Sequence, residues 1–470
     1  MSKIAIIGAG SIVFCSTFLN DIFNIKEFDG CEIALMSPTF TKVNKVKDYA
    51  EKIIQANNLK TKVYATTDRR EALKDAKYVI CTFQIGGVEA FKYDYEIPMK
   101  YGVDQCIGDS LGPGGVFRLL RSTPLFDTLD EEIKELCPDA YVLNYVNPMG
   151  AVCTYLGRYT KMKYVGLCHG VQTTMDLISG YVNVPKEEID FVAAGINHMA
   201  WFLNLEHNGK DLYPLLRENM EKPEYYVNEK VRGEVMRQCG YFMTESTGHL
   251  SEYLPWFRKN QQALDLYCDM PDFGGETGAY YNYSKFISDK YLTEDVFELE
   301  SGKLDPRSAE YCSYVLEAIE TGVPFKFNGN VFNDELFISN LPADSCVEVP
   351  MFVDNQGFHP LSVGQLPPPL AAMNLSNITV QSLAAAGAKM ADPELVFWAI
   401  AMDPLTSAVL DLNQIRNMVA EMFEAEKQWL PQFEGKTLKS TPVISIPADV
   451  KPADVPIDPA LAINARFGKL

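Results

Sequence analysis

The 470-residue sequence lacks several features that mark large classes of proteins. Acidic residues outnumber basic ones by 62 to 42, and the net charge of −20 argues against nucleic-acid binding, which needs basic patches. No apolar run approaches the roughly 18–20 residues of a membrane span. Eleven cysteines, an odd number without a Cys-x-x-Cys pair, fit thiols kept reduced in the cytoplasm. Histidine is scarce, with five in the chain, so a histidine beside a motif is informative.

The composition is that of a well-packed globular protein, with 47% hydrophobic and 11% aromatic residues. The length exceeds one ordinary domain, so we expect two joined domains. The first residues predict a strand rather than a secretory signal, because glycines and a polar turn follow at once. We expect a first domain over residues 1–195, a second over 196–436 and a proline-punctuated tail over 437–470 that lies extended on a surface or a neighbouring subunit.

Strand and helix patterns alternate through the first half of the chain. Strands are expected at 3–7, 32–36, 62–64, 78–83, 140–146 and 164–167, and helices at 14–24, 40–57 and between the later strands. This alternation predicts an α/β fold with a Rossmann-like, doubly wound parallel sheet. In such sheets ligands bind outside the carboxyl ends of the strands. Glycine-rich or polar stretches follow several of these strands, at 8–11, 84–87, 144–148 and 168–169.

The pattern changes after about residue 195. Longer helical windows at 306–321 and 379–390 enclose a short strand at 346–353. We therefore expect the second domain to be α+β and to close over the first.

A Gly-Ala-Gly-Ser turn at residues 8–11 lies between the first strand and the first helix, where backbone can approach a pyrophosphate. The alternative is a tight strand-to-helix turn. Val13 replaces the usual third glycine, and Ser37 stands where an acid would bind ribose hydroxyls, so the choice between NAD and NADP stays open. The expected cofactor-binding residues are Gly8, Gly10, Ser11, Ile12, Ser37 and Gln84.

Cys168 and His198 are candidate metal ligands that would leave open positions for substrate oxygens. The alternative is a buried cysteine and a hydrogen-bonded core histidine, and spacing alone favours it. His169 titrates near neutral pH and suits general acid catalysis, or else it orients the metal site.

Two further residues are candidates with weaker signals. Asp109 lies in a Gly-Asp-Ser-Leu-Gly-Pro-Gly-Gly loop at 108–115, before a helix predicted at 116–121. Its carboxylate could hydrogen-bond a base or a sugar hydroxyl, or cap a turn or helix. Tyr253 would be a base only if a cation lowered its pKa, and otherwise it packs in the core.

Together these motifs resemble glycoside hydrolase family 4, the NAD- and metal-dependent glycosidases. The likeness covers nearly the whole chain and favours the metal interpretation of Cys168 and His198. It runs through the turn at 8–11 and through 112–115, 144–149, 168–170, 194–198, 347–350 and 402–404. The stretches 107–115, 195–200 and 244–253 are most similar to the α-galactosidase branch.

The resemblance implies a redox-assisted elimination, an exception to two-carboxylate hydrolysis. NAD would oxidise C3 of the sugar, and Mn²⁺ or another divalent metal on Cys168 and His198 would stabilise the enediolate formed by C2 deprotonation. After elimination of the glycosidic oxygen, water adds at C1 and the hydride returns.

Roles for the remaining residues also follow from the resemblance. Tyr253 matches the family's base, and Asp109 matches the position that raises the basicity of that tyrosine. His169 matches the donor that protonates the leaving oxygen and contacts the substrate. Asn147 matches a substrate-contacting asparagine.

The sugar is less well specified. The α-galactosidases typically show Cys-His-Ser-Val, whereas this chain has Gly170 after the histidine, as in the Cys-His-Gly of α-glucosidases. The resemblance implies an α-galactosidase, with α-glucosidase or α-uronidase as alternatives. A simple NAD-dependent dehydrogenase and a non-catalytic ligand sensor are the rivals outside the family. The expected partners are a small α-glycoside and further copies of the chain, as a homodimer or homotetramer, with no nucleic acid and no membrane.

Overall fold

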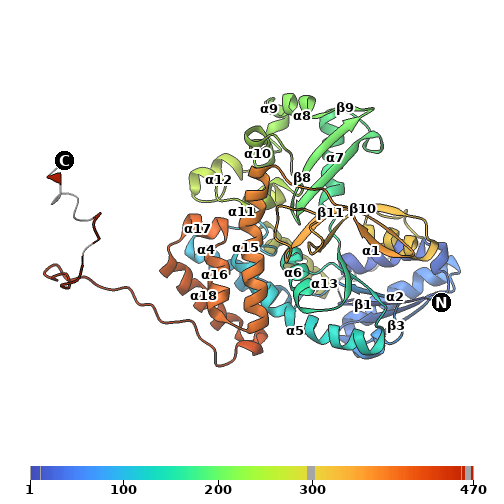
Figure 1. Cartoon of the computed structure of the whole chain (residues 1–470). Helices are drawn as coiled ribbons and strands as arrows, with labels where there is room; N and C mark the ends of the chain where they lie inside the picture. The colour runs from blue at the N-terminus through green and yellow to red at the C-terminus, as the bar shows by residue number, and fades with distance from the viewer. Residues whose placement is uncertain (1, 11, 294–301, 457, 461–466, 469–470) are drawn as a thin grey trace. The chain divides into compact units, whose positions relative to one another are not determined.

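The computed structural model describes the chain except for residues 1, 11, 294–301, 457, 461–466 and 469–470, and except for the side chains of 12–14 and 291–293 (Figure 1). The chain forms two units, residues 1–438 and 439–470. In the second unit, the described residues up to 456 form turns and bends without a helix or strand.

Six parallel strands form the first part of the sheet, in the order β3-β2-β1-β4-β5-β6. They are β1 (Lys3–Ile7), β2 (Glu32–Met36), β3 (Lys62–Thr66), β4 (Tyr78–Cys81), β5 (Tyr141–Asn144) and β6 (Lys163–Gly166). This is the dinucleotide-binding order, which confirms the Rossmann-like prediction. The central strand β1 is buried over residues 4–7, as expected when helices cover both faces.

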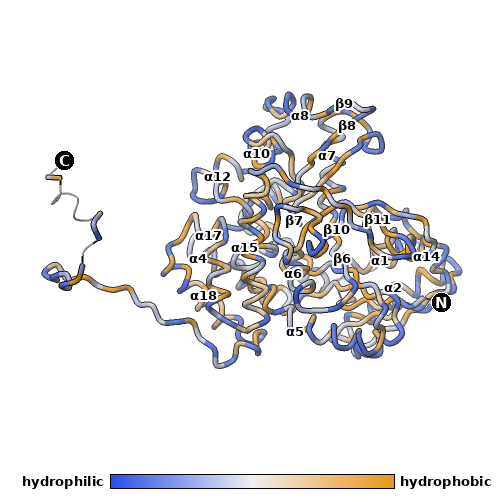
Figure 2. The backbone as a smooth tube through the Cα atoms, in the orientation of Figure 1, coloured by the Kyte–Doolittle hydropathy of each residue, from blue (hydrophilic) through white to orange (hydrophobic). Residues whose placement is uncertain are grey.

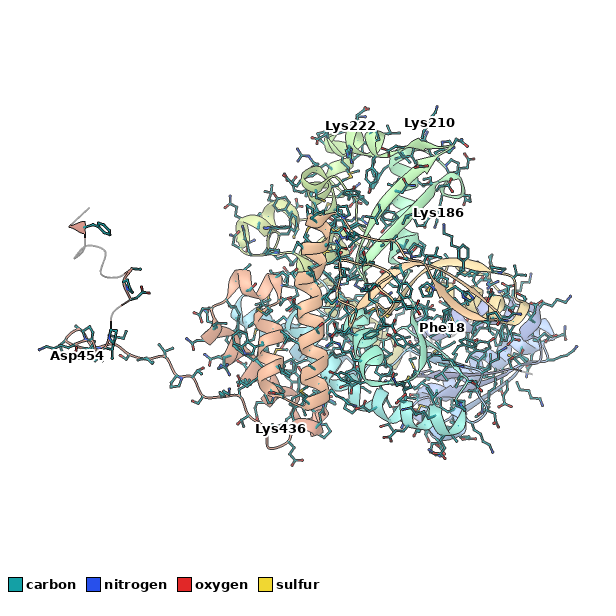
Figure 3. All side chains as sticks on the ribbon, viewed as in Figure 1. Phe18, Lys186, Lys210, Lys222, Lys436 and Asp454 are labelled. Carbon is teal, nitrogen blue, oxygen red and sulfur yellow. The ribbon has the colours of Figure 1, made fainter. Side chains whose placement is uncertain are left out.

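The connections between these strands are helical. They are α1 (Ile12–Phe23), α2 (Phe40–Asn57), α3 (Arg69–Leu73), α4 (Gly87–Tyr101), α5 (Gly112–Leu136) and α6 (Met149–Tyr159), and α7 (Gly170–Val182) follows β6. In α2 the buried residues recur at helical spacing, at Val43, Val46, Ala50 and Ile53, so one face packs inward. In α1, Phe18 lies within the body (Figure 3).

Antiparallel strands extend the same sheet. β10 (Phe325–Phe332) pairs with β6 and with β11 (Cys346–Asp354), and β7 (Asp190–Ile196), β8 (Met199–His207) and β9 (Lys210–Asp211) follow. β12 (Gly357–Pro360) pairs with β11. Within the described residues, twelve strands thus form one mixed sheet. β7 and β8 form a hairpin, and the predicted domain boundary at residue 195 stays a prediction.

Helices dominate the second half of the sequence, as expected. They are α8 (Tyr213–Met220), α9 (Pro223–Tyr226), α10 (Arg232–Cys239), α11 (Thr247–Tyr253), α12 (Gln261–Tyr267), α13 (Ala279–Thr293), α14 (Tyr311–Thr321), α15 (Pro368–Met390), α16 (Pro393–Ala401), α17 (Pro404–Val409) and α18 (Leu412–Glu426). Short 3-10 helices cover Lys26–Phe28, Lys186–Glu188, Asp272–Gly274, Lys427–Trp429 and Pro431–Phe433. The long α15 crosses the centre of the body beside α16 and α6 (Figure 1).

Several predicted bounds are wrong for identifiable reasons. The helix expected at 306–321 begins only at Tyr311, because Ser308 is held through its amide and hydroxyl by the Asp21 carboxylate. The strand expected at 140–146 ends at Asn144, whose side chain hydrogen-bonds the backbone of Val146 and turns the chain. The helix expected at 379–390 is the second half of α15.

The hydrophobic core lies between the sheet and the helices that pack on it. One large buried cluster spans the parallel strands and the helices on both faces, and a smaller one lies between α7, β8 and α8. Figure 2 shows hydrophilic residues in the outer loops near α8 and β9, and Figure 3 places Lys210 and Lys222 at that outer edge. Among the described residues, no helix is long and apolar enough to cross a membrane.

Candidate active site

Three side chains from distant parts of the sequence converge near the middle of the sheet. Cys168 follows β6, His198 occupies the turn between β7 and β8, and Glu245 precedes α11. One potential ligand atom from each lies within 4.8 Å of the other two. A thiolate, an imidazole and a carboxylate are together a donor set suited to a divalent transition-metal ion.

His198 is held in a form that can bind a metal. Its backbone has φ of +64°, which the tight hairpin turn requires. Burial lowers the pKa of the imidazole to about 4, so the ring is neutral at neutral pH. Its Nδ1 lies 3.2 Å from the hydroxyl of Tyr253, and its Nε2 lies 3.6 Å from Oε2 of Glu245. The ring therefore links the predicted base on one side to the convergent carboxylate on the other.

Cys168 is half-buried and lies two residues before α7 begins. The amide of Gly170 donates to its Sγ over 3.5 Å. Burial, with the charges of Glu245 and Glu348, raises the pKa of the thiol well above its ordinary value. A bound cation reverses this, because a coordinating thiol is held as thiolate.

Glu245 was missed by the sequence analysis. It lies at φ +76°, its amide donates to Thr174 Oγ1 over 3.2 Å, and its carbonyl accepts from the Arg232 guanidinium. Burial raises the pKa of the carboxyl, but the His198 and His249 imidazoles outweigh it and hold the pKa well below its usual range. Glu245 lies in the 244–253 stretch that resembles the α-galactosidase branch, but a single glutamate there has no spacing signal, so the fold was needed to place it beside Cys168 and His198.

Asp109 and Asn147, both predicted, are brought together. Asn147 Nδ2 donates to Asp109 Oδ2 over 3.1 Å, and Arg118 Nη1 donates to the same oxygen over 2.9 Å. Burial opposes ionisation, but Arg118 and these hydrogen bonds lower the pKa of Asp109. Asp109 does not cap α5, whose N-cap residue is Leu111 with no side-chain hydrogen bond.

The predicted loop over 108–115 is wrong in its second half. Residues 112–115 form the first turn of α5, not a loop before it. A Cβ on Gly114 would lie 2.3 Å from the carbonyl oxygen of Gly108, and one on Gly115 would lie 2.8 Å from the carbonyl carbon of Ser110. The two glycines thus let the loop that carries Asp109 fold back onto the helix start.

Tyr253 is the last residue of α11 and is 2% exposed. Burial raises the pKa of its phenol well above the ordinary value, and the charges of Asp109 and Glu245 raise it further. A neighbouring cation acts in the opposite direction.

His169 directly follows Cys168 and contacts a different carboxylate. Its side chain is half exposed, and Nδ1 lies 3.3 Å from Oε1 of Glu310, the residue before α14. This interaction raises the pKa of the imidazole. Glu310 was also missed by the sequence analysis, because nothing in its local sequence points to residue 169.

The predicted cofactor residues gather at the carboxyl ends of β1, β2 and β4. The amides of Gly8 and Ala9 already donate to the carbonyl of Met36, so these two amides serve the turn itself. A Cβ on Gly10 would lie 2.9 Å from Oγ of Ser37, which places these two residues side by side. Gln84 follows β4 and donates to the carbonyl of Gly87.

Two of the predicted cofactor residues are wholly or partly outside the described residues. Ser11 lies outside the described residues, as does the side chain of Ile12. What is described fits a dinucleotide: the turn leads from β1 into α1 at the sheet edge where such ligands bind.

Known proteins are similar to this chain over most of its length. The chain matches the family 4 glycosyl hydrolase model over residues 3–184 and the family 4 glycosyl hydrolase C-terminal domain over residues 193–406. An alpha-galactosidase of Rhizobium meliloti (strain 1021) is 39% identical, covering 92% of this chain and 89% of that protein. An alpha-galactosidase of Bacillus subtilis (strain 168) is 36% identical, covering 92% of this chain and all of that one.

Solved structures share the fold. A 6-phospho-alpha-glucosidase from gut microorganisms, crystallised with NAD and Mn²⁺, has a TM-score of 0.75 at 20% identity, covering 91% of this chain and 98% of that one. The family match spans most of the sequence, which confirms the resemblance drawn from its motifs. The chain belongs to family 4 of the glycosyl hydrolases.

Proposed function

We propose that the enzyme hydrolyses small α-galactosides, using bound NAD and a divalent ion such as Mn²⁺. The observation that carries this proposal is the convergence of Cys168, His198 and Tyr253 in one buried cluster of a family 4 chain. The identity of 36–39% to two alpha-galactosidases supports the sugar class. We also propose, from the sequence, that the enzyme works in the cytoplasm as a homodimer or homotetramer.

The two bound groups supply chemistry that the side chains lack, namely a reversible hydride acceptor and a Lewis acid. Cys168 and His198 would hold the ion. If Nε2 of His198 is the ligand atom, Nδ1 would carry the proton and would donate to the oxygen of Tyr253, which lies 3.2 Å away. This arrangement orients the imidazole and stabilises the tyrosinate.

Tyr253 would remove the proton from C2 of the sugar once C3 is a ketone, which makes that proton acidic. Asp109 supports the role because its charge strengthens the base, and Arg118 keeps Asp109 ionised. Asn147, held by Asp109, would place its amide against a sugar hydroxyl.

His169 would protonate the leaving glycosidic oxygen. The Glu310 carboxylate raises the pKa of the imidazole, so the ring holds its proton to higher pH than an unpaired histidine does, which suits a general acid. The half-exposed position of His169 leaves room for the departing group.

The decisive experiment is an assay of aryl α-galactoside hydrolysis with NAD⁺, Mn²⁺ and a thiol reductant. We expect turnover that stops on chelation and shows a primary isotope effect with substrate deuterated at C2. Absence of activity, or activity indifferent to chelation, would refute the proposal. Net accumulation of NADH during turnover would indicate a dehydrogenase instead.

A second candidate is an α-glucosidase or an α-uronidase of the same family. Gly170 favours the α-glucosidase of these two, because this position has the glycine of the Cys-His-Gly stretch in that branch and lacks the serine typical of the galactosidase branch. Parallel assays with aryl α-glucoside and aryl α-galacturonide distinguish the three sugars.

A further inference from the structure

Gly170 and Glu245 share one small space beside the proposed metal site. A Cβ built on Gly170 would lie 2.9 Å from Oε2 of Glu245, which is closer than two such atoms normally approach, and 3.6 Å from Sγ of Cys168. Gly170 is the first residue of α7 and does not have positive φ, so its backbone does not require glycine. Because Gly170 has no side chain, Oε2 of Glu245 can occupy the space where a Cβ would otherwise lie.

The two oxygens of Glu245 face two different imidazoles. Oε2 lies 3.6 Å from Nε2 of His198, and Oε1 lies 3.6 Å from Nδ1 of His249. The separation from His198 is too long for a good hydrogen bond. It is close to the roughly 3.0–3.5 Å between two ligand atoms that each lie about 2.1 Å from one ion. His249 is buried at the back of the carboxylate, where it can orient a ligand as neighbouring histidines and carboxylates commonly do.

The backbone of Glu245 is fixed to the same helix that carries Gly170. The hydroxyl of Thr174 donates to the carbonyl of Gly170 over 2.7 Å and accepts from the amide of Glu245. The carbonyl of Glu245 accepts from Arg232, whose guanidinium is held by Glu229. A non-glycine residue at φ +76° persists only where its surroundings hold it, and such positions cluster at functional sites.

We propose that Glu245 is a third protein ligand of the divalent ion, admitted to the site by the absent side chain at position 170. The inference rests on the proposed function, because it takes Cys168 and His198 as the other two ligands. Three protein ligands with further positions open is the usual arrangement of a catalytic metal site. A carboxylate also adds a hard donor that favours Mn²⁺ over softer ions.

The test measures Mn²⁺ binding directly, in the full-length protein without substrate or NAD. The electron paramagnetic resonance signal of free aqueous Mn²⁺ reports the dissociation constant, and circular dichroism verifies that each variant is folded. We expect Glu245→Gln to raise the Kd for Mn²⁺ by at least about tenfold. The loss should be smaller for Zn²⁺, which thiolate and imidazole hold without help from a hard oxygen.

Gly170→Ala provides an independent variant that leaves Glu245 intact. Its methyl group would displace Oε2, so we expect a loss of Mn²⁺ affinity of similar size. The double variant should lose little more than either single one, because both changes remove the same contact. The matched control is Glu310→Gln, which removes a carboxylate beside His169 and should leave the Kd within about twofold of the wild-type value.

Unchanged Mn²⁺ affinity in folded Glu245→Gln would overturn the inference, as would losses that multiply in the double variant. These outcomes are distinct from failure of the proposed function. If the wild-type protein binds Mn²⁺ and Cys168→Ser does not, the proposed function stands whatever the result at Glu245. If the wild-type protein binds no Mn²⁺, the proposed function fails with the inference.

Discussion

The proposed cofactor edge and the proposed metal cluster are built in opposite ways. The cofactor edge, residues 8–10, 37 and 84, consists of backbone turns at adjacent parallel strands, with glycines where neighbouring chains come close. The metal cluster, Cys168, His198, Glu245 and Tyr253, consists of side chains from three separate segments. The cofactor edge depends on steric fit, so added side-chain atoms are poorly tolerated there. The metal cluster depends on functional groups, so we expect substitutions to remove them one at a time without changing the backbone.

The largest expected effect comes from removing the thiolate. Cys168→Ser deletes one of the proposed ligands, and the loss of Lewis-acid stabilisation worth several kcal/mol should lower kcat/KM by about 10³-fold or more. Excess Mn²⁺ should restore part of the activity if the remaining ligands still form a site. Steady-state kinetics across a Mn²⁺ titration provide the measurement.

Cys239→Ser is the matched control for that variant. Cys239 is also half-buried and free, but it lies at the end of α10 and its sulfur faces the carbonyl of Tyr241. Activity should be unchanged. Equal losses in both variants would mean that the effect at Cys168 is structural.

The next effect concerns the base. Tyr253→Phe keeps the ring but removes the oxygen 3.2 Å from His198 Nδ1, so kcat should fall by roughly 10²- to 10⁴-fold. Mn²⁺ affinity should fall far less, because the ligand atom is the other nitrogen. Full activity in this variant would rule out the proposed role, and a C2 isotope effect that grows as kcat falls would support it.

The contrast between the two regions also explains what the sequence could reveal. The parallel strands, α2 and the turn at Gly8 follow from local patterns, since apolar runs, helical spacing and glycine act within a few residues. The donors at 168 and 198 were recognisable by type beside their motifs. Glu245, which faces His198, and Glu310, which faces His169, were not, because each meets its histidine only through a tertiary contact. The start of α5 was hidden for a related reason: its glycines look like a loop and serve close packing instead.

A pair of glycine variants tests whether the cofactor edge is defined by steric fit. In Gly8→Ala, the new Cβ would lie 2.7 Å from backbone atoms of Thr82 and Phe83, at φ +99°. We expect a loss of roughly 2–5 kcal/mol in the free energy of unfolding. In Gly87→Ala, at φ +54°, no atom in the described part of the chain lies within 4 Å of the new Cβ, so only the backbone cost of about 1–2 kcal/mol remains. Urea denaturation compares the two. Equal losses would mean that backbone conformation, and not contact across the strands, makes glycine necessary at position 8.

The smallest effect tests whether buried charge near the metal cluster costs stability. Asp403 is 1% exposed and caps α17, with Oδ2 accepting from the amide and hydroxyl of Thr406, while Oδ1 has no hydrogen-bond partner among the described residues. Burial, with the nearby charge of Glu252, raises the pKa of this carboxyl from 3.8 to about 6. A raised pKa means that the folded state holds the proton more tightly than the unfolded state. The stability it contributes is therefore present below about pH 4 and is lost as the pH rises through about 6.

Asp403→Asn should remove this dependence. The amide keeps an oxygen for Thr406 and stays neutral, so the variant should match the wild type near pH 4 and exceed it by up to about 3 kcal/mol at pH 7.5. Urea denaturation at several pH values measures the difference. A difference that stays constant from pH 4 to pH 8 would mean that the carboxyl does not change its charge in this range. A difference that grows with pH would mean that Asp403 is ionised at neutral pH although this charge lowers the free energy of unfolding. The cofactor edge differs, because there the space between the strands is what limits substitution.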